Sequence, residues 1–178
     1  GAILNGASDG VAIREVPGGC MCCVSGVPMQ IGLTQLIRKA RPDRLLIEPT
    51  GLGHPNEILT ILKGENYSDI LDVRAVVTLV DPRKLDDNRY REHKIYSDQL
   101  NVADVLVANK VDVCSESDLA SFDALLSQMK SRYADRISQG ALDSAWLDVE
   151  HDSTEGNLVK VHHHERNQVK SIDALQLS

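Results

Sequence analysis

Three of the chain's four cysteines lie within four residues, at Cys20, Cys22 and Cys23. Thiolates are soft ligands that favour Zn²⁺, Cu(I) and similar ions. The preceding Gly18 and Gly19 permit a tight loop, so the three sulfur atoms can converge on one ion. A closed structural zinc site takes four ligands, so three local cysteines leave one position open, which favours a site that loads and unloads metal. An inert buried cluster and a thiol redox switch stay open as alternatives.

A second candidate site follows the apolar run at 44–47 and consists of Glu48 and Gly51. A carboxylate at a strand end can hold the water shell of a Mg²⁺ ion. A glycine three residues later lets a backbone N–H approach a γ-phosphate and lets the loop move on hydrolysis. The alternative is a strand capped by an ordinary turn, in which Gly51 is needed only for its dihedral freedom. We interpret the nearby His54 as a positional rather than a catalytic residue.

The third candidate site, Asn109, Lys110 and Asp112, follows an apolar run at 104–108. One carboxylate can accept hydrogen bonds from both N1–H and the 2-amino group of guanine, and adenine has no such pair of donors. A site built on such hydrogen bonds rejects the analogue that lacks them by roughly 10⁴ or more at best. The aliphatic part of the Lys110 side chain can lie over the flat base, and Asn109 can tie neighbouring loops to the base. The alternative for this third site is an ordinary surface turn. We interpret Asp81, which follows another apolar run, as a strand cap.

Alternating strand-like and helix-like segments position these three sites. Short apolar runs predict buried strands, and apolar residues spaced three or four apart predict helices between them. This alternation predicts a three-layer αβα fold with a mainly parallel sheet, in which ligands bind at the carboxyl ends of the strands. Strands are expected at 11–16, 44–48, 73–80, 104–108 and near Ile137, helices at 28–40, 55–62, 83–100 and 115–133, and an orphan strand at 169–177.

The domain organisation predicted from the sequence is one α/β domain over residues 1–150. Residues 151–178 are expected to form a linker that can lead into a C-terminal domain. The run His162–His164 can supply auxiliary metal ligands, but we favour a solvated linker there. Cys114, distant from the cluster, we interpret as a structural residue.

Composition excludes several classes of protein. Hydrophobic residues make up 42% and charged residues 25%, as in globular domains. The net charge of -7 and the lack of a basic stripe argue against nucleic-acid binding. No apolar run approaches the ~18–20 residues of a membrane span, and no signal peptide is visible. The clustered cysteines do not form the framework of a secreted disulfide-bonded domain, so we expect a reducing cytoplasmic location.

The three motifs occur in an order and spacing that resemble the CobW-like metal-chaperone GTPases, relatives of the hydrogenase and urease nickel-insertion GTPases. The motifs are Gly-Cys-Met-Cys-Cys at 19–23, Glu-Pro-Thr-Gly-Leu-Gly-His-Pro at 48–55 and Asn-Lys-Val-Asp at 109–112. The resemblance covers residues 11–113 well and continues more loosely to about Asp148. The combination is far more specific than any one motif alone.

The resemblance implies a P-loop GTPase fold and a metal ion whose transfer to a client metalloprotein is coupled to GTP. Zn²⁺ is the usual suggestion for the family, and cobalt is also proposed. Carried over by position, Cys20, Cys22 and Cys23 are metal ligands, Glu48 and Gly51 belong to the magnesium and switch motif, and Asn109, Lys110 and Asp112 read guanine.

The sequence also departs from this family pattern. The phosphate-binding loop Gly-x-x-x-x-Gly-Lys-Ser/Thr does not occur in the 178 residues, nor does the acidic segment that precedes the cysteines in relatives. We therefore expect a GTPase-like core that lacks its first strand and phosphate loop. It should hydrolyse GTP negligibly, bind it weakly at best and be able to self-associate through an uncovered sheet surface. The alternatives are a metal-binding adaptor without nucleotide hydrolysis and a thiol redox switch.

Overall fold

The chain forms two compact units of α/β structure, Gly1–Gly64 with Val169–Ser178, and Glu65–Gln168. Strand pairs within the described residues are all parallel, apart from one isolated antiparallel bridge between Arg74 and Glu150. This confirms the predicted α/β fold with mainly parallel strands. The computed structural model describes residues 11–16, 26–49, 51, 53–91, 93–129, 133–151, 160–161 and 173–177.

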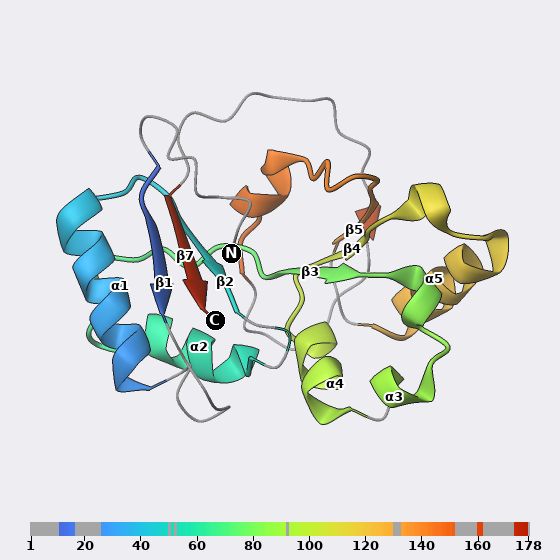
Figure 1. Cartoon of the computed structure of the whole chain (residues 1–178), viewed down its shortest axis with the longest axis horizontal. Coiled ribbons are helices and arrows are strands. Elements are labelled where there is room, and N and C mark those ends of the chain that lie inside the picture. Colours follow the sequence, from blue (N-terminus) through green and yellow to red (C-terminus); the bar gives the residue numbers. More distant parts are fainter. Residues whose placement is uncertain are drawn as a thin grey trace. The chain divides into compact units, whose positions relative to one another are not determined.

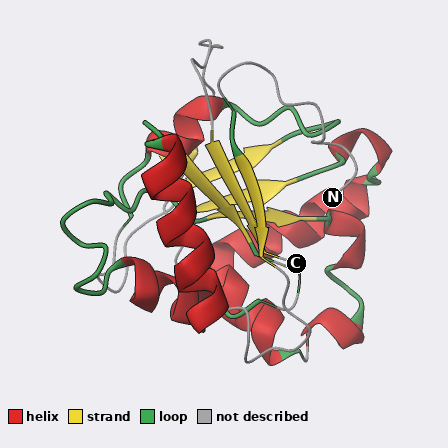
Figure 2. Cartoon of the chain, turned by 60° about the vertical axis from the view of Figure 1, so that its left-hand side comes forward, coloured by secondary structure: helices red, strands yellow, loops and turns green. Residues whose placement is uncertain are grey.

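The first unit contains a three-stranded parallel sheet in the order β1-β7-β2, so the last strand of the chain lies between the first two (Figure 1). The expected strand at 169–177 is therefore no orphan, because it pairs on both sides. The longest helix, α1, packs against β1 and β7 (Figure 2). The elements are β1 (Ile13–Val16), α1 (Val27–Ala40), β2 (Leu45–Glu48), α2 (Pro55–Leu62) and β7 (Asp173–Leu177).

Helix α1 follows the start, stop and periodicity signals of the sequence. Pro28 occupies the first turn, where its missing N–H costs no helical hydrogen bond. The helix ends at Ala40, and the C-cap residue Arg41 adopts the left-handed conformation with a φ of 48° and donates its N–H to the carbonyl of Ile37. The apolar face buries Met29, Leu33 and Leu36.

The second unit contains a four-stranded parallel sheet in the order β3 (Val77–Val80), β4 (Val105–Ala108), β5 (Tyr133–Arg136) and β6 (Lys160–Val161). Strand β4 is its centre, because all four of its residues are fully buried. Successive side chains of a strand point to opposite faces of the sheet. Leu106 packs in a hydrophobic cluster on one face with Phe122 of helix α5 (Glu116–Gln128), and Val107 packs in a second cluster that contains Trp146. Both faces of β4 are therefore covered within this unit.

The helical segments of the second unit are shorter than the sequence predicts. The expected helix at 83–100 is broken into η1, α3 and α4, in part because Asp87 accepts a hydrogen bond from the backbone N–H of Arg89. The predicted capping box at Ser115 and Asp118 is confirmed, but α5 ends at Gln128 instead of continuing to 133. The elements are β3 (Val77–Val80), η1 (Pro82–Lys84), α3 (Asn88–Arg91), α4 (Lys94–Asn101), β4 (Val105–Ala108), η2 (Val111–Val113), α5 (Glu116–Gln128), β5 (Tyr133–Arg136), η3 (Ser144–Asp148) and β6 (Lys160–Val161).

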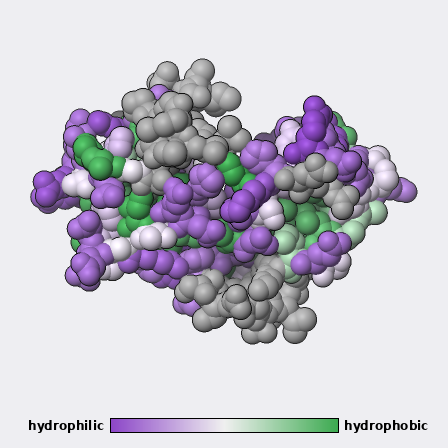
Figure 3. All heavy atoms as spheres, turned by 90° about the horizontal axis from the view of Figure 1, so that it is seen from below, coloured by the Kyte–Doolittle hydropathy of each residue, from purple (hydrophilic) through white to green (hydrophobic). Residues whose placement is uncertain are grey.

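Hydrophilic side chains dominate the described part of the face shown in Figure 3, with smaller apolar areas between them. No helix in the described ranges is long and apolar enough to cross a membrane. Large apolar side chains that remain exposed are Val27, Ile31, Ile70, Leu79, Tyr90 and Val113.

Candidate functional site

The loop with the proposed guanine-reading residues leaves the carboxyl end of β4, as predicted. Two neighbouring strands hold it there. The N–H of Asn109 donates to the carbonyl of Val80 at the end of β3, over 2.8 Å. The N–H of Ile137, directly after β5, donates to the carbonyl of Ala108, also over 2.8 Å. The start of the loop is therefore fixed by the sheet that carries it.

Lys110 has an unusual backbone conformation, with a φ of 61° and a ψ of 34°. This left-handed region is uncommon for residues other than glycine, so neighbouring contacts must stabilise it. The Asn109 side-chain oxygen accepts from the N–H of Lys110 over 2.8 Å, and the Cys114 thiol donates to the Lys110 carbonyl over 3.3 Å. Asn109 thus braces its own loop, and its predicted role in tying neighbouring loops to a base stays a prediction.

Asp112 lies two residues further on, in the short 3₁₀ turn η2, with an exposed side chain. The turn is held on the side of β5, because the N–H of Val111 donates to the carbonyl of Ile137 over 3.2 Å. An exposed carboxylate on a braced turn can accept hydrogen bonds from a flat ligand that carries two parallel donors.

The turn after β5 is a neighbour of this loop that the sequence did not reveal. Gln139 and Gly140 both have positive φ angles, of 52° and 72°. Ile137 donates its N–H to the carbonyl of Ala108 and accepts from the N–H of Val111. The turn after β5 therefore starts next to the Lys110–Asp112 loop. Gly140, four residues after the end of β5, is the signal of this turn in the sequence.

Asp81 is more than the strand cap that the sequence suggested. Its carboxylate accepts from Arg83 Nε over 2.8 Å and from Arg83 Nη2 over 2.6 Å, and the Lys110 ammonium lies 3.4 Å from Oδ2. The side-chain hydrogen bonds from Arg83 lower the pKa of Asp81 well below its usual range, and Asp81 in turn raises the pKa of Arg83. The carboxylate is therefore ionised at neutral pH and faces the guanine loop.

Glu48 and Gly51 belong to the first unit. Glu48 is the exposed last residue of β2, and Gly51 lies in an exposed turn where an added Cβ would meet no atom within 4 Å. His54 is the N-cap residue of α2, and its side chain makes no capping hydrogen bond. Both site residues thus stand at the carboxyl end of a strand, where the sequence placed them.

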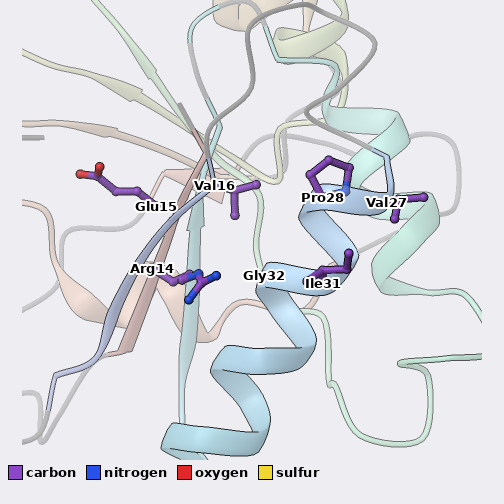
Figure 4. Close-up of a pocket in the computed structure, with 7 residues that line it drawn as sticks. All are labelled: Arg14, Glu15, Val16, Val27, Pro28, Ile31 and Gly32. Carbon is purple, nitrogen blue, oxygen red and sulfur yellow. The ribbon is translucent and has the colours of Figure 1, made fainter.

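The cysteine motif, Cys20, Cys22 and Cys23, lies outside the described residues, but the elements on either side of it are defined. β1 ends at Val16 and α1 begins at Val27, and these residues line one pocket of about 340 Å³ (Figure 4). Val16 is paired with Leu177 of β7 in the sheet, and the adjacent Gln176 is paired with Glu48. The strand that leads to the cysteines and the strand that ends in Glu48 therefore finish at the same edge of one sheet.

The part of the chain that the structure describes contains no group of three or more His, Cys, Asp or Glu residues able to hold a metal ion. Cys114 is a free thiol there, partly buried in the guanine loop. Burial raises the pKa of this thiol, with the neighbouring carboxylates of Asp118 and Asp81 acting in the same direction. A neutral thiol that donates to a backbone carbonyl fits the structural role predicted for Cys114.

Comparison with known proteins shows which family the chain resembles in sequence. A family model described as the CobW/HypB/UreG nucleotide-binding domain matches residues 1–135. The zinc chaperone YeiR of Escherichia coli (strain K12) is 52% identical over 112 residues, 63% of this chain and 34% of that protein. The zinc chaperone CobW of a Sinorhizobium species is 30% identical over 142 residues, 67% of this chain and 40% of that protein.

A eukaryotic relative carries a name that refers to a GTPase. The zinc-regulated GTPase metalloprotein activator 1 of Schizosaccharomyces pombe is 30% identical over 104 residues, 57% of this chain and 25% of that protein. The chain therefore spans less than half the length of these curated relatives. No solved structure matches it.

Proposed function

Because the chain belongs to the CobW/HypB/UreG family of nucleotide-binding domains, we propose that it is the core of a GTP-binding metallochaperone. In this proposal the protein binds Zn²⁺ or a similar ion and couples its transfer to GTP hydrolysis. The family assignment agrees with the resemblance and the P-loop GTPase type of α/β fold expected from the sequence. The names of the relatives, two zinc chaperones and a zinc-regulated GTPase metalloprotein activator, support the roles of nucleotide and zinc.

The observation that carries the nucleotide half of the proposal is the braced loop after β4. Asn109 fixes the loop, Lys110 extends its side chain along the ends of the strands, and Asp112 presents an exposed carboxylate beside them. In this arrangement the aliphatic part of the Lys110 side chain can cover a base, and the Asp112 carboxylate can accept two parallel hydrogen bonds from it. Parallel α/β sheets bind their ligands at this edge.

For the metal half, we propose that Cys20, Cys22 and Cys23 hold the cargo ion. Three thiolates suit Zn²⁺ best and also suit Co²⁺, and they leave one coordination position for a ligand from a client metalloprotein. This transfer would take place in the cytoplasm, where thiols stay reduced.

We further propose that Glu48 and Gly51 form the magnesium and switch motif. The exposed carboxylate of Glu48 suits the water shell of Mg²⁺, which supplies charge neutralisation on the phosphates when bound. An added Cβ at Gly51 would meet no atom within 4 Å, so packing does not explain the glycine, which is compatible with a role in a loop that changes conformation. β2 and β1, the strand that precedes the cysteine motif, end at the same edge of one sheet, which supports a coupling between the switch motif and the metal site.

The test of this function is a titration of the chain with GDP and ADP, followed by backbone amide chemical shifts, which report binding even in the millimolar range. We expect GDP to shift amides of the 109–113 loop and ADP to leave them unchanged. Asp112→Ala should weaken GDP binding at least about tenfold, because it removes a charged hydrogen-bond acceptor. Asp69→Ala, at another exposed carboxylate, is the matched control and should bind GDP like the wild type.

A second substitution tests the chemistry of the base directly. Asp112→Asn offers one acceptor and one donor, which match the N1–H and the 2-oxo group of xanthine. We expect this variant to prefer xanthosine diphosphate over GDP, the reverse of the wild type. Equal responses to GDP and ADP in the wild type, or an Asp112→Ala variant with unchanged GDP binding, would overturn the proposed function.

A further inference from the structure

Two charged side chains meet where β3 and β4 end. In the register of these parallel strands Val80 is paired with Ala108, so Asp81 and Asn109 are the first residues beyond the paired strands. Lys110 turns back over this edge through its left-handed backbone, and its ammonium group lies 3.4 Å from Asp81 Oδ2. The aliphatic stem of Lys110 thus extends from the end of β4 toward the end of β3.

We propose that Asp81, held in place by Arg83, is a positioning residue of the guanine site that fixes the Lys110 stem across the strand ends. The inference rests on the proposed guanine-nucleotide function. Asp81 itself need not touch the ligand, because it acts through Lys110.

The geometry around Asp81 is that of a preorganised acceptor. Arg83 approaches with two side-chain nitrogens, at 2.8 Å and 2.6 Å, and its backbone N–H donates to Oδ1 over 3.3 Å. Such paired, charge-assisted hydrogen bonds fix the plane of a carboxylate. The Asp81 side chain is only 20% exposed, whereas that of Lys110 is 56% exposed. The rigid partner is therefore the aspartate, and the long flexible lysine is the one that gains order.

An ordered lysine matters because a flexible side chain must otherwise be immobilised when the ligand binds. That cost is about 0.5–1.5 kcal/mol for one rotamer-rich side chain. If Asp81 orders Lys110 beforehand, its loss should weaken guanine-nucleotide binding by about three- to tenfold. The effect should vanish when Lys110 has no side chain to order.

The simplest competing explanation is that Asp81 and Arg83 only stabilise their own turn, and the chain offers a matched control for this. Asp87 and Arg89 repeat the arrangement six residues later, with a backbone N–H at 3.0 Å, Arg89 Nε at 3.1 Å and Nη2 at 2.6 Å. The Asp87 side chain is 24% exposed, close to the value for Asp81. The two pairs share this hydrogen-bond pattern and differ in two ways: only Asp81 also contacts the lysine of the guanine loop, and Arg83 is 38% exposed whereas Arg89 is 85% exposed.

The experiment is a double-mutant cycle read by GDP titration, with amide chemical shifts as the signal. The variants are Asp81→Asn, Asp87→Asn, Lys110→Ala and the combination of Asp81→Asn with Lys110→Ala. We expect Asp81→Asn to weaken GDP binding three- to tenfold and Asp87→Asn to change it less than twofold. In the Lys110→Ala background, Asp81→Asn should have no further effect. NMR relaxation of the Lys110 side chain should show an ordered stem in the wild type and a mobile stem in Asp81→Asn. Circular dichroism verifies that the Asp81→Asn variant is folded.

Each outcome separates this inference from the function on which it rests. GDP binding that is lost in Asp112→Ala but unchanged in Asp81→Asn overturns the role of Asp81 alone. Equal losses in Asp81→Asn and Asp87→Asn, or a loss that persists in the Lys110→Ala background, also overturn it, because Asp81 would then act through the turn. A wild-type chain that does not bind GDP overturns the proposed function and this inference together.

Discussion

The Nδ1 atom of His151 lies 2.7 Å from Oδ2 of Asp104, and the two side chains are only 7% and 5% exposed. The same Asp104 oxygen accepts from the backbone N–H of Val76 over 2.8 Å. Asp104 immediately precedes β4, so this contact lies at the amino end of the strand, opposite the guanine loop at its carboxyl end. It ties the segment after η3 to the start of the central strand.

Removing either partner of this buried pair should destabilise the second unit. Asp104→Ala leaves the Val76 N–H and the His151 ring without this acceptor, and loss of one partner of a buried polar pair costs about 3 kcal/mol. We expect His151→Ala to cost about 2 kcal/mol, measured as the free energy of urea unfolding. Lys94→Ala, which breaks the exposed pair with Asp98, is the control and should change stability by less than about 1 kcal/mol. A stability of Asp104→Ala equal to that of Lys94→Ala would contradict the importance of the pair.

Helix α1 packs closely against strand β1 at Gly32, where an added Cβ would lie 2.7 Å from Cγ2 of Val16 (Figure 4). Val16 is β-branched and cannot easily turn that methyl group away. Gly32→Ala should therefore destabilise the first unit by about 1–2 kcal/mol, despite the better helix propensity of alanine. In a Val16→Ala background the same change should be neutral or stabilising. Hydrogen exchange of the α1 amides is the measurement, with Gly51→Ala as the control in open space.

The sequence predicted the core strands and the places of the polar motifs because those signals are local. β2 and β4 are built on short apolar runs, and Glu48 ends β2 and Asn109 follows β4, as expected. The pairing of β7 with both β1 and β2 could not be predicted, because it joins residues more than 120 positions apart along the chain. No local pattern specifies such a partner.

Two further features could not be predicted from the sequence, because they depend on contacts between distant parts of the chain. Tyr133 continues the helical spacing of α5, yet it begins β5 and pairs with Val105, so tertiary pairing outweighed the local period. The contact between Asp81 and Lys110 depends on the adjacency of β3 and β4 and on a left-handed residue in the loop. The sequence therefore identified Lys110 as a site residue but gave Asp81 only a capping role.

Acid should lower the stability of the fold by protonating Asp81 and Asp87, which are paired with Arg83 and Arg89. The side-chain hydrogen bond from Arg89 lowers the pKa of Asp87 from 3.8 to about 2, and that from Arg83 lowers the pKa of Asp81 further. A carboxyl whose pKa is depressed in the folded state stabilises the fold above its unfolded pKa, near 4, and this stability is lost as pH falls toward the folded pKa. The urea midpoint should therefore fall between pH 4 and pH 2. The combined Asp81→Asn and Asp87→Asn variant should fall less steeply, and identical slopes would count against both pairs.

GTP hydrolysis by the 178-residue chain should be negligible. The backbone amides and the lysine of a Gly-x-x-x-x-Gly-Lys-Ser/Thr loop supply most of the phosphate binding in such enzymes, and the motif does not occur in these residues. Phosphate release in the presence of GTP and Mg²⁺ should match a control without protein. Release above that control, abolished by Asp112→Ala, would show that the chain catalyses the reaction with other groups.

Zinc binding should depend on the clustered cysteines and not on Cys114. Even substitutions that only support a metal ligand cost about 10–100-fold in affinity, so removing a direct thiolate should cost at least that much. We expect Cys22→Ser to lower Zn²⁺ affinity at least about tenfold, measured by competition with a chromophoric chelator under reducing conditions. Cys114→Ser is the matched control, since the thiol of Cys114 is held by the Lys110 carbonyl, and it should bind Zn²⁺ like the wild type. Equal affinity in Cys22→Ser and the wild type, together with reversible disulfide formation among the clustered thiols, would instead favour a redox switch.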